Sequence, residues 1–237
     1  ELYKNKKIGL IGWKMFTTQN EEPSELFDLP YFIVDAVKNS LSTDTILTNA
    51  AQLLIGPKGI RTINNANELA HYEYGANLAS RCILNAMNQL KIGMKESEIG
   101  AILSDEGQAH SVITIAASGE RFKKANFYPT YKKINFGEPI SMTTGFKGGL
   151  SSRTGFLVNE EKELPDNQKH YLTDIVIPYY KGVVSWLENI SIGMSGNDFY
   201  KMIDDNLPKS NYNWHLNPGH YVADEEWMAS PFYKNSK

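Results

Sequence analysis

One internal repeat limits the folds open to this chain more than any other feature of its sequence. The segments LKIGMKESEIGAIL (residues 90–103) and ISIGMSGNDFYKMI (residues 190–203) share Ile-Gly-Met, an acidic residue four positions after the Met, and an apolar helical pattern. Short repeats of roughly 20–50 residues indicate solenoids. A period of 100 residues instead predicts two fused α/β halves related by a pseudo-two-fold axis. Chance similarity around a common helix–glycine–helix turn is the alternative.

The predicted elements follow the same order around both copies. Apolar spacing predicts a long helix before each copy and a short helix within it. In the first half a strand and a β-hairpin follow, and the turn of that hairpin is GFKGG. A strand and not a helix comes after these glycines, which favours a tight hairpin over a phosphate-binding loop. The predicted segments are helices at 67–90 and 95–107, strands at 110–119 and 138–158, and helices at 166–190 and 196–207.

The first fifty-odd residues form a separate α/β pattern. Residues 8–13 predict a buried strand, and residues 28–41 and 44–56 predict two helices. The segment GPKG that follows is the best linker candidate, because glycine and proline interrupt regular structure. We therefore expect two domains, one at 1–58 and one at 62–237.

Composition excludes several classes of function. A net charge of −3 argues against a nucleic-acid or anionic-membrane surface, which needs clustered Lys and Arg. No apolar run approaches the roughly 20 residues that a membrane-spanning helix requires. We find no signal peptide, and the single cysteine, Cys82, excludes an internal disulfide framework. These features predict a cytoplasmic protein without nucleic-acid or membrane partners.

Several short motifs, in their order and spacing, resemble the creatinase/methionine-aminopeptidase family. The resemblance implies an α/β pita-bread fold with an internal pseudo-two-fold duplication over 62–237. It also implies part of a creatinase-like N-terminal α/β domain over 1–58. We expect the pita-bread domain to be truncated, with the family's two metal-binding glutamates beyond residue 237. The motifs are the Ile-Gly-Met turn with its acidic residue, AASGERF (116–122), NFYP (126–129), SRTG (152–155) and NPGHY (217–221).

In this family the peptidases bind two divalent metals through two hairpin aspartates, a histidine and two glutamates. The first aspartate position falls at about Thr143 and the second near Leu150–Ser152, and neither is acidic. Two cations about 4 Å apart need anionic ligands to offset their repulsion, and neutral hydroxyls do not supply that charge. We therefore predict no dinuclear metal centre and no other cofactor.

Creatinase itself looks like a metal-free member of this fold. The resemblance therefore implies that this chain can catalyse hydrolysis without a metal. By that resemblance His220 is the predicted acid/base, because the imidazole pKa lies nearest neutrality. Glu226 is the predicted catalytic partner that orients it. Glu225, Asn126 and Arg153 are predicted to bind substrate, and Arg153 is suited to a bidentate pair with a carboxylate.

Each of these residues also has a structural interpretation. His220 can satisfy backbone groups in its loop, and Glu225 and Glu226 can form a solvated acidic turn. Arg153 can be an ion-pair partner on the hairpin, and the Asn126 amide can cap a turn.

We expect a hydrolase that cleaves a C–N bond in a small molecule or peptide without a dinuclear metal. A non-catalytic pita-bread module that binds a peptide or protein is the alternative. A third possibility is an active Xaa-Pro aminopeptidase, which requires a different hairpin register. Only Glu138 competes for a metal in that case, since no acidic residue lies between Pro139 and Asn159. The resemblance also implies a homodimer.

Overall fold

The computed structural model describes residues 6–12, 16, 23–55, 58–104, 107–124, 127–214, 219, 232 and 234. The described chain divides into two compact units between Glu68 and Leu69. Each unit has its own secondary structure and is described separately below. The domain limits 1–58 and 62–237 stay predictions.

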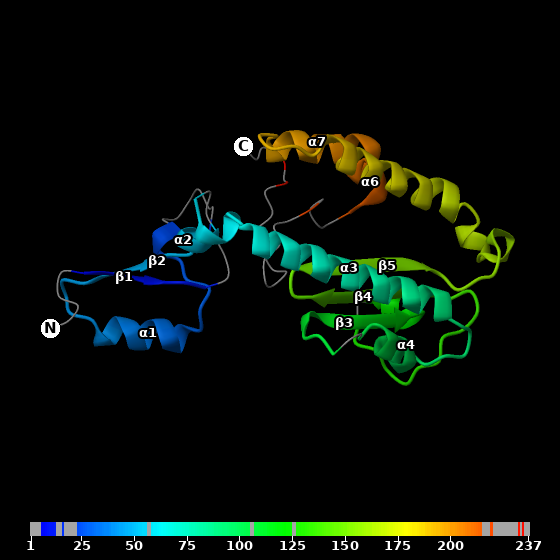
Figure 1. Ribbon diagram of the computed structural model, residues 1–237, viewed down its shortest axis with the longest axis horizontal. Helices are drawn as coiled ribbons and strands as arrows, with labels where there is room; N and C mark the ends of the chain where they lie inside the picture. The colour runs from blue at the N-terminus through cyan, green and yellow to red at the C-terminus, as the bar shows by residue number, and fades with distance from the viewer. Residues whose placement is uncertain are drawn as a thin grey trace. The chain divides into compact units, whose positions relative to one another are not determined.

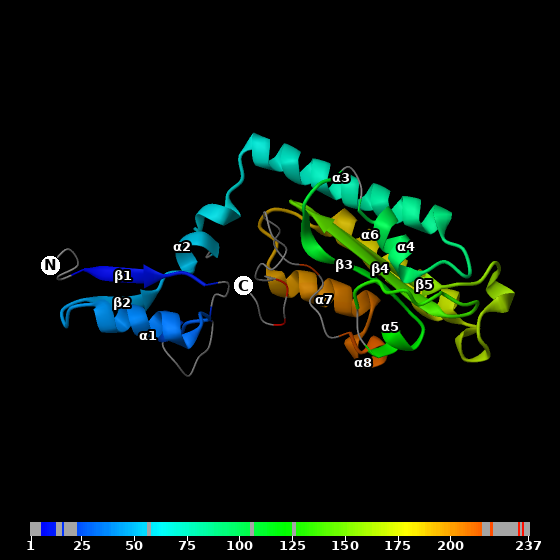
Figure 2. The same cartoon turned by 90° about the horizontal axis from the view of Figure 1, so that it is seen from below.

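The N-terminal unit is a small α/β arrangement. Strands β1 (Lys7–Leu10) and β2 (Ile46–Asn49) pair in parallel, with Lys7 opposite Ile46. Helix α1 (Tyr31–Ser40) lies between them in the chain and runs beside them in space (Figure 2). A parallel pair needs such a crossover connection, because the chain must return to the starting end of the first strand before the second strand begins. Shorter helices complete the unit: η1 (Pro23–Glu25), α2 (Gln52–Ile55) and η2 (Ile60–Thr62).

The prediction of one helix over 44–56 is wrong. Its first half is strand β2, and only the four residues of α2 are helical. Asn49 separates the two, because its Oδ1 accepts a hydrogen bond from the Ala51 backbone N–H at 2.8 Å. Its Nδ2 donates to the Leu26 carbonyl at 2.6 Å. Pairing with β1 and this side-chain turn override the helical spacing of the apolar residues.

The larger unit contains the two helix pairs that the repeat predicts. Helices α3 (Ala66–Gln89) and α4 (Glu96–Ile102) form the first pair, and α6 (Ile177–Asn189) and α7 (Gly196–Asn206) form the second. Each pair is joined through a glycine with positive φ, +89° at Gly93 and +94° at Gly193. The duplication is therefore confirmed in the helices. Shorter helical elements are α5 (Glu120–Lys124), η3 (Glu161–Glu163), η4 (Asp166–Gln168), the π-helical η5 (Leu172–Val176) and α8 (Lys209–Tyr212).

Three antiparallel strands follow the first helix pair. They are β3 (His110–Ser118), β4 (Pro139–Phe146) and β5 (Gly149–Phe156), and β4 lies in the middle (Figure 1). The predicted tight hairpin is confirmed, because Phe146 pairs directly with Gly149 across a two-residue turn. None of the described helices is both long enough and apolar enough to cross a membrane.

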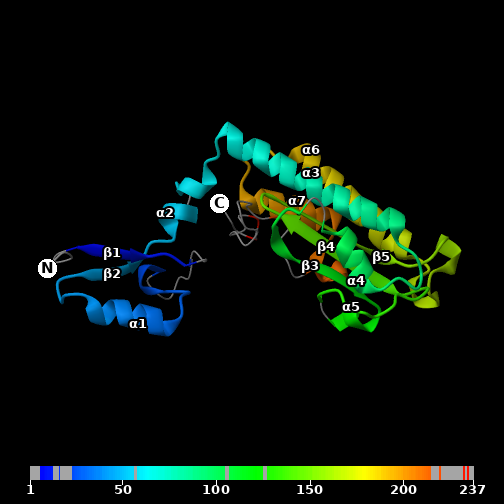
Figure 3. The ribbon, with the colours of Figure 1, turned by 60° about the horizontal axis from the view of Figure 1, so that its bottom comes forward.

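Helices α3 and α4 cover one face of this sheet (Figure 3). Ile83 and Ala86 of α3, Ile99 of α4 and Leu103, which directly follows α4, are at most 3% exposed and pack with strand residues. Near the middle of α3, just before Ile83, Leu78, Ala79 and Cys82 pack with Phe146. The strand and loop members of the main cluster are Ala116, Ile134, Ile140, Met142 and Leu157.

Glycines allow α3 to approach the hairpin turn closely. A Cβ atom on Gly75 would lie 2.4 Å from the Lys147 carbonyl oxygen, and one on Gly149 would lie 2.2 Å from the Ala76 nitrogen. Such contacts exclude any larger side chain at either position. The glycines of GFKGG thus serve helix packing and the hairpin turn, where Gly148 has φ of +90°.

Candidate functional site

The candidate site lies on the face of the hairpin that points away from α3 and α4. Side chains alternate between the two faces of a strand. On β4, Ile140 and Met142 belong to the core cluster, and Thr144 donates to the Leu103 carbonyl in the same direction. Ser141 and Thr143 therefore lie on the opposite face. This is the face on which the resemblance places the metal-binding aspartates.

The ladder brings the two suspected metal positions together. Thr143 pairs with Ser152 across the hairpin, and their hydroxyl oxygens lie 2.7 Å apart. The second position was predicted within Leu150–Ser152, and within that range Ser152 is the residue that pairs directly with Thr143, while Leu150 pairs with Gly145 on the same face. Thr143 is 7% exposed, so its hydroxyl is largely shielded from water. The two groups that would be carboxylates in a metal site are neutral and hydrogen-bonded to each other.

The rest of this face is neutral as well. Ser141, which is 2% exposed, stands opposite Thr154, and the β3 neighbours are Ile115 and Ala117. Hydroxyls and methyl groups offer hydrogen bonds and dispersion contacts but no formal charge. This donor set does not fit a dinuclear metal centre. Among the described residues, no group of three His, Cys, Asp or Glu side chains is placed to hold a metal ion.

Arg153 lies on the other face of the hairpin. It pairs with Met142, which points into the core, so its exposed side chain emerges on the α3 side of the edge strand. Its Nη1 donates to the Ser152 carbonyl at 2.7 Å. The predicted role of Arg153 in substrate binding stays a prediction, and the ladder does not put it beside Thr143 and Ser152.

Glu138, the one acidic residue that could compete for a metal, is already paired. Its carboxylate accepts from Lys132 Nζ at 2.6 Å and from the Asn135 side chain at 3.1 Å. Burial raises the pKa of Glu138, but hydrogen bonds from Lys132 and Asn135 outweigh burial and leave the pKa below its ordinary value. The side chain is thus a charged member of a local ion pair at the start of β4.

A buried carboxylate that the sequence analysis missed connects several of the motifs. Glu96 begins α4 and is 0% exposed. Its Oε1 accepts from the Ser118 backbone N–H at 2.8 Å and from the Ser118 hydroxyl at 3.0 Å. Its Oε2 accepts from the Thr130 hydroxyl at 2.6 Å and from Arg121 Nε at 3.2 Å. Every bond joins α4 to a residue at least 22 positions away in the chain.

These bonds keep Glu96 ionised. Burial raises the pKa of Glu96, while hydrogen bonds from Thr130 and Ser118 and the nearby Arg121 charge lower it. The result is a pKa below the ordinary value of 4.5. The buried charge therefore has compensating partners, as buried carboxylates require.

Arg121 extends the network to the NFYP motif. Its Nη2 donates to the Tyr128 carbonyl at 2.8 Å, and its guanidinium lies 5.0 Å from the centre of the Phe127 ring. The motifs AASGERF and NFYP thus belong to one structural network around Glu96. An acidic residue at the first turn of a short helix looks like ordinary helix capping in sequence, which is why Glu96 was overlooked.

The other predicted site residues lie outside the described part of the chain. These are the predicted acid/base His220, its partner Glu226, and the predicted substrate-binding residues Glu225 and Asn126. Their roles stay predictions, and the part of the candidate site that lies within the described residues is the neutral hairpin face.

The structure resembles several solved peptidases. It matches a Xaa-Pro dipeptidase from Bacillus anthracis with a TM-score of 0.70 and 19% identity, over 88% of this chain and 58% of that one. It matches the prolidase from Pyrococcus furiosus with a TM-score of 0.72 and 18% identity, over 98% of this chain and 65% of that one. An X-Pro aminopeptidase from Thermotoga maritima gives a TM-score of 0.66 and 17% identity, over 83% and 55%.

Neither protein-family models nor curated protein sequences give a match to this chain. The chain spans less than two thirds of the length of the three solved peptidases. At these identities the likeness concerns the fold. It confirms the fold that the motifs predicted, and the chain has the α/β pita-bread fold shared by prolidases and Xaa-Pro aminopeptidases.

Proposed function

We propose that this protein hydrolyses a C–N bond in a small molecule or peptide without a dinuclear metal centre. The observation that carries the proposal is the Thr143–Ser152 pair, whose hydroxyl oxygens lie 2.7 Å apart where the resemblance expects two carboxylates. Two divalent cations about 4 Å apart repel each other strongly, and the attraction of bridging anions normally offsets this repulsion. Hydroxyl groups contribute no such anion at neutral pH.

In this proposal the reaction rests on general acid–base catalysis. His220 transfers the proton, and Glu226 orients its imidazole. Glu225 and Asn126 hold the substrate, and the hydroxyls of Thr143 and Ser152 can bond to its polar atoms. Arg153 is proposed to bind a substrate carboxylate, which requires the substrate to reach the edge of β5.

A cytoplasmic homodimer is part of the same proposal. The sequence has one cysteine, Cys82, which is buried in α3, and a chain that uses no internal disulfide suits a reducing compartment. The ligand is a small molecule or peptide, and no nucleic-acid or membrane partner is proposed.

A binding module is the second candidate, and one observation favours it. Ser141, Thr143, Ser152 and Thr154 line the described hairpin face with neutral groups alone. Such a surface can recognise the amide groups of a peptide without cleaving them. In that case the hairpin face would bind a peptide or protein and would not catalyse a reaction.

The test is a hydrolysis screen of dipeptides and small amides or ureas, run with and without EDTA. The wild type is compared with His220→Ala and with His170→Ala. The second variant is a control, because it removes an exposed histidine that lies between η4 and η5. Activity that survives EDTA, persists in His170→Ala and disappears in His220→Ala supports the proposal.

Two other outcomes contradict it. Activity that EDTA abolishes would restore a metal-dependent Xaa-Pro aminopeptidase. Absence of turnover, together with peptide binding in calorimetry, would favour the binding module.

A further inference from the structure

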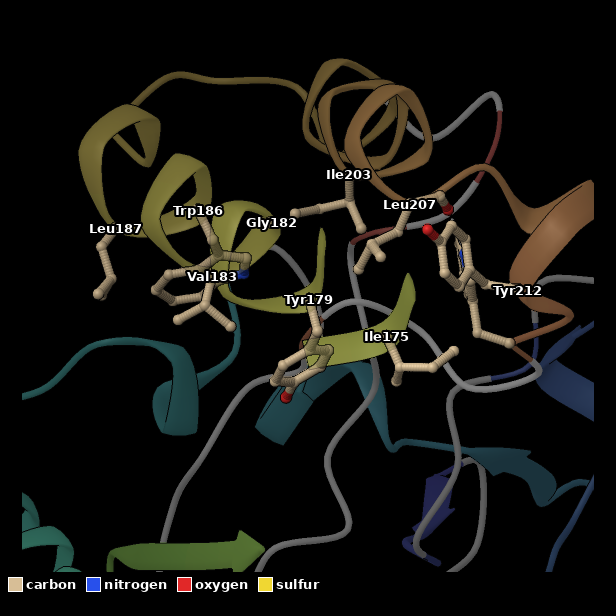
Figure 4. A pocket seen from close by; sticks show the side chains of 10 residues that line it. Ile175, Tyr179, Gly182, Val183, Trp186, Leu187, Ile203, Leu207 and Tyr212 are labelled. Atoms are coloured by element: carbon tan, nitrogen blue, oxygen red, sulfur yellow. Dashed lines mark hydrogen bonds between the residues drawn. The ribbon is translucent and has the colours of Figure 1, made fainter. Parts of the chain in front are cut away.

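The larger unit contains a groove and a smaller hollow that differ in chemistry. The groove lies between α6 and α7 and has a volume of about 650 Å³ (Figure 4). The described residues that line it are apolar or aromatic, among them Tyr179, Val183 and Trp186, and none of them is charged. This lining offers no feature that selects a particular partner. The smaller hollow lies beside η3 and combines apolar side chains with carboxylates.

We call the smaller one the η3 hollow, and its volume is about 180 Å³. Phe156 and Tyr171 meet edge to face in its wall, with ring centres 5.0 Å apart. Leu164 is 6% exposed, whereas Glu160 and Glu161 are exposed, so the carboxylates lie at the mouth. Small-molecule pockets have volumes of roughly 300–1,000 Å³. A hollow of this size suits one side chain, and its chemistry favours an aromatic ring flanked by positive charges.

The segment that borders the η3 hollow is strongly acidic. Residues 159–166 (NEEKELPD) contain four carboxylates and one lysine, which gives a formal charge of −3. Lys162 pairs with Glu160, with 2.6 Å between Nζ and Oε2. Within the described residues, Glu161 forms no ion pair. A cationic partner therefore finds a carboxylate at the mouth of the hollow that is not yet neutralised.

Tyr131 is a side chain of matching shape on the same unit. It is 83% exposed, although the chain on either side of it is held in place. The Thr130 hydroxyl donates to the Glu96 carboxylate at 2.6 Å, and the Lys132 carbonyl accepts the Glu96 backbone N–H at 2.9 Å. An exposed aromatic side chain on a fixed backbone loses little conformational entropy on binding, which suits it to anchor an interface.

Two lysines surround Tyr131 with positive charge. Lys95 and Lys133 stand directly opposite each other in an antiparallel bridge, and Lys95 Nζ lies 5.7 Å from the centre of the Tyr131 ring. Like charges at directly opposite positions repel each other. Neither lysine forms an ion pair within the described part of the chain, and the nearby Glu98 carboxylate accepts the Lys95 backbone N–H. An acidic partner would relieve this repulsion.

Hydrogen bonds place both features at one end of the sheet, where β4 begins and β5 ends. The Gly137 backbone N–H donates to the Leu157 carbonyl at 2.8 Å, and the Leu157 N–H donates to the Glu138 carbonyl at 2.9 Å. Tyr131 and Lys133 come just before the first segment of this contact in the chain, and the acidic segment comes just after the second. Two complementary surfaces on one chain suit a two-fold contact, because each copy then offers both.

We propose that two copies of this chain associate with Tyr131 of each copy in the η3 hollow of the other. The ring packs against the aromatic wall of the hollow, while Lys133 pairs with Glu161 at its mouth. The inference rests on the homodimer of the proposed function and not on its hydrolysis. It assigns the surface through which the two copies meet.

Sedimentation velocity on the full chain tests the inference by charge reversal. Lys133→Glu and Glu161→Lys each replace attraction by repulsion at both symmetric contacts, so each should raise the Kd of the dimer about 10-fold or more. An equimolar mixture of the two variants should recover near-wild-type affinity, because opposite charges face each other at both contacts of the mixed dimer. Lys201→Glu, which changes an exposed lysine of α7, is the matched control and should leave the Kd unchanged.

Tyr131→Ala tests the aromatic anchor. It should raise the Kd about 30-fold, an effect typical of interface hot spots. Tyr128→Ala is its control, because Tyr128 is an aromatic residue of the same loop that is 62% exposed and lies outside the proposed contact. It should leave the Kd near the wild-type value. Thermal unfolding of each variant confirms that the exposed substitutions leave the fold intact.

The outcomes separate the interface from the rest of the proposed function. A wild-type chain that sediments as a monomer would overturn both this inference and the homodimer. A wild-type dimer that Lys133→Glu and Tyr131→Ala leave intact would overturn the inference alone. Single variants that dissociate but fail to associate when mixed would also contradict it. None of these readouts uses turnover, so a failed hydrolysis screen would not alter them.

Discussion

Helices α3 and α6 occupy equivalent places in the repeat, yet one face of α3 is buried while the equivalent face of α6 is exposed. The α3 residues Ala79 and Ile83 are 0% and 3% exposed, whereas their α6 counterparts Tyr179 and Val183 are 62% and 37% exposed. Both helices are amphipathic, and both lead into a glycine turn with nearly the same φ. The local sequence thus determines that a helix has an apolar face, but the burial of that face depends on strands that are distant in the sequence.

The two halves also differ in chemistry. Glu96 begins α4 with a buried carboxylate that accepts hydrogen bonds from three distant residues. The equivalent position at the start of α7 is Gly196, which has no side chain to bond with. The repeat therefore preserves helix geometry, while among the described residues the buried polar network around Glu96 lies in the first half.

Glu96→Gln should give the largest effect on stability. It removes the charge that Arg121 faces and places an amide N–H₂ against donors, so we expect a loss of about 3–5 kcal/mol in the free energy of unfolding. Glu98→Gln is the control in the same helix, because Glu98 only accepts the Lys95 backbone N–H at the exposed helix start. Urea denaturation at pH 7 measures both. Equal losses in the two variants would contradict the importance of the buried network.

The Glu96 contribution should also depend on pH in a defined direction. Because the folded-state pKa of Glu96 lies below its ordinary value of 4.5, its ionised form favours the folded state. This stabilisation is complete above about pH 4.5 and is lost as the pH falls through the lower folded-state pKa. The stability gap between wild type and Glu96→Gln should therefore narrow in acid. A gap that widens below pH 4.5 would contradict the sign of the shift.

Ile83→Ala and Val183→Ala compare the two helix faces directly. Ile83 is 3% exposed and packs in the main core, so its truncation should cost about 2–4 kcal/mol. Val183 is 37% exposed, and its truncation should cost about 1 kcal/mol or less. Thermal unfolding of the two variants beside wild type gives both values. A Val183→Ala loss as large as that of Ile83→Ala would show that the second face is covered as completely as the first.

Gly93→Ala and Gly193→Ala should have smaller and similar effects. Both glycines have positive φ and open space around the position of a Cβ, so the cost comes from backbone strain alone. We expect about 1 kcal/mol for each, measured by urea denaturation. A cost confined to one of the two turns would break the structural equivalence of the repeats.

Much of the fold could be predicted because its signals are local. Helical spacing identified α3, and the glycines of GFKGG identified the hairpin between β4 and β5. The segment 44–56 was misread, because strand β2 gains its pairing from β1, almost forty residues earlier in the chain. Apolar spacing over so short a segment does not separate a buried strand from a helix.

The candidate site could be placed only in part. The sequence located one suspected metal position at Thr143, but cross-strand pairing was needed to select Ser152 as its partner. Arg153 looked close to these positions in sequence, and strand alternation puts it on the opposite face. Glu96 was missed because its partners Ser118, Arg121 and Thr130 converge only in three dimensions.

Metal content tests the central claim most directly. The purified protein is incubated with manganese, cobalt or zinc, freed of unbound ions and examined by elemental analysis. A neutral hairpin face built on Thr143 and Ser152 predicts no stoichiometric bound metal. About two equivalents per chain, as in a two-metal hydrolase, would contradict the account and require other residues as ligands.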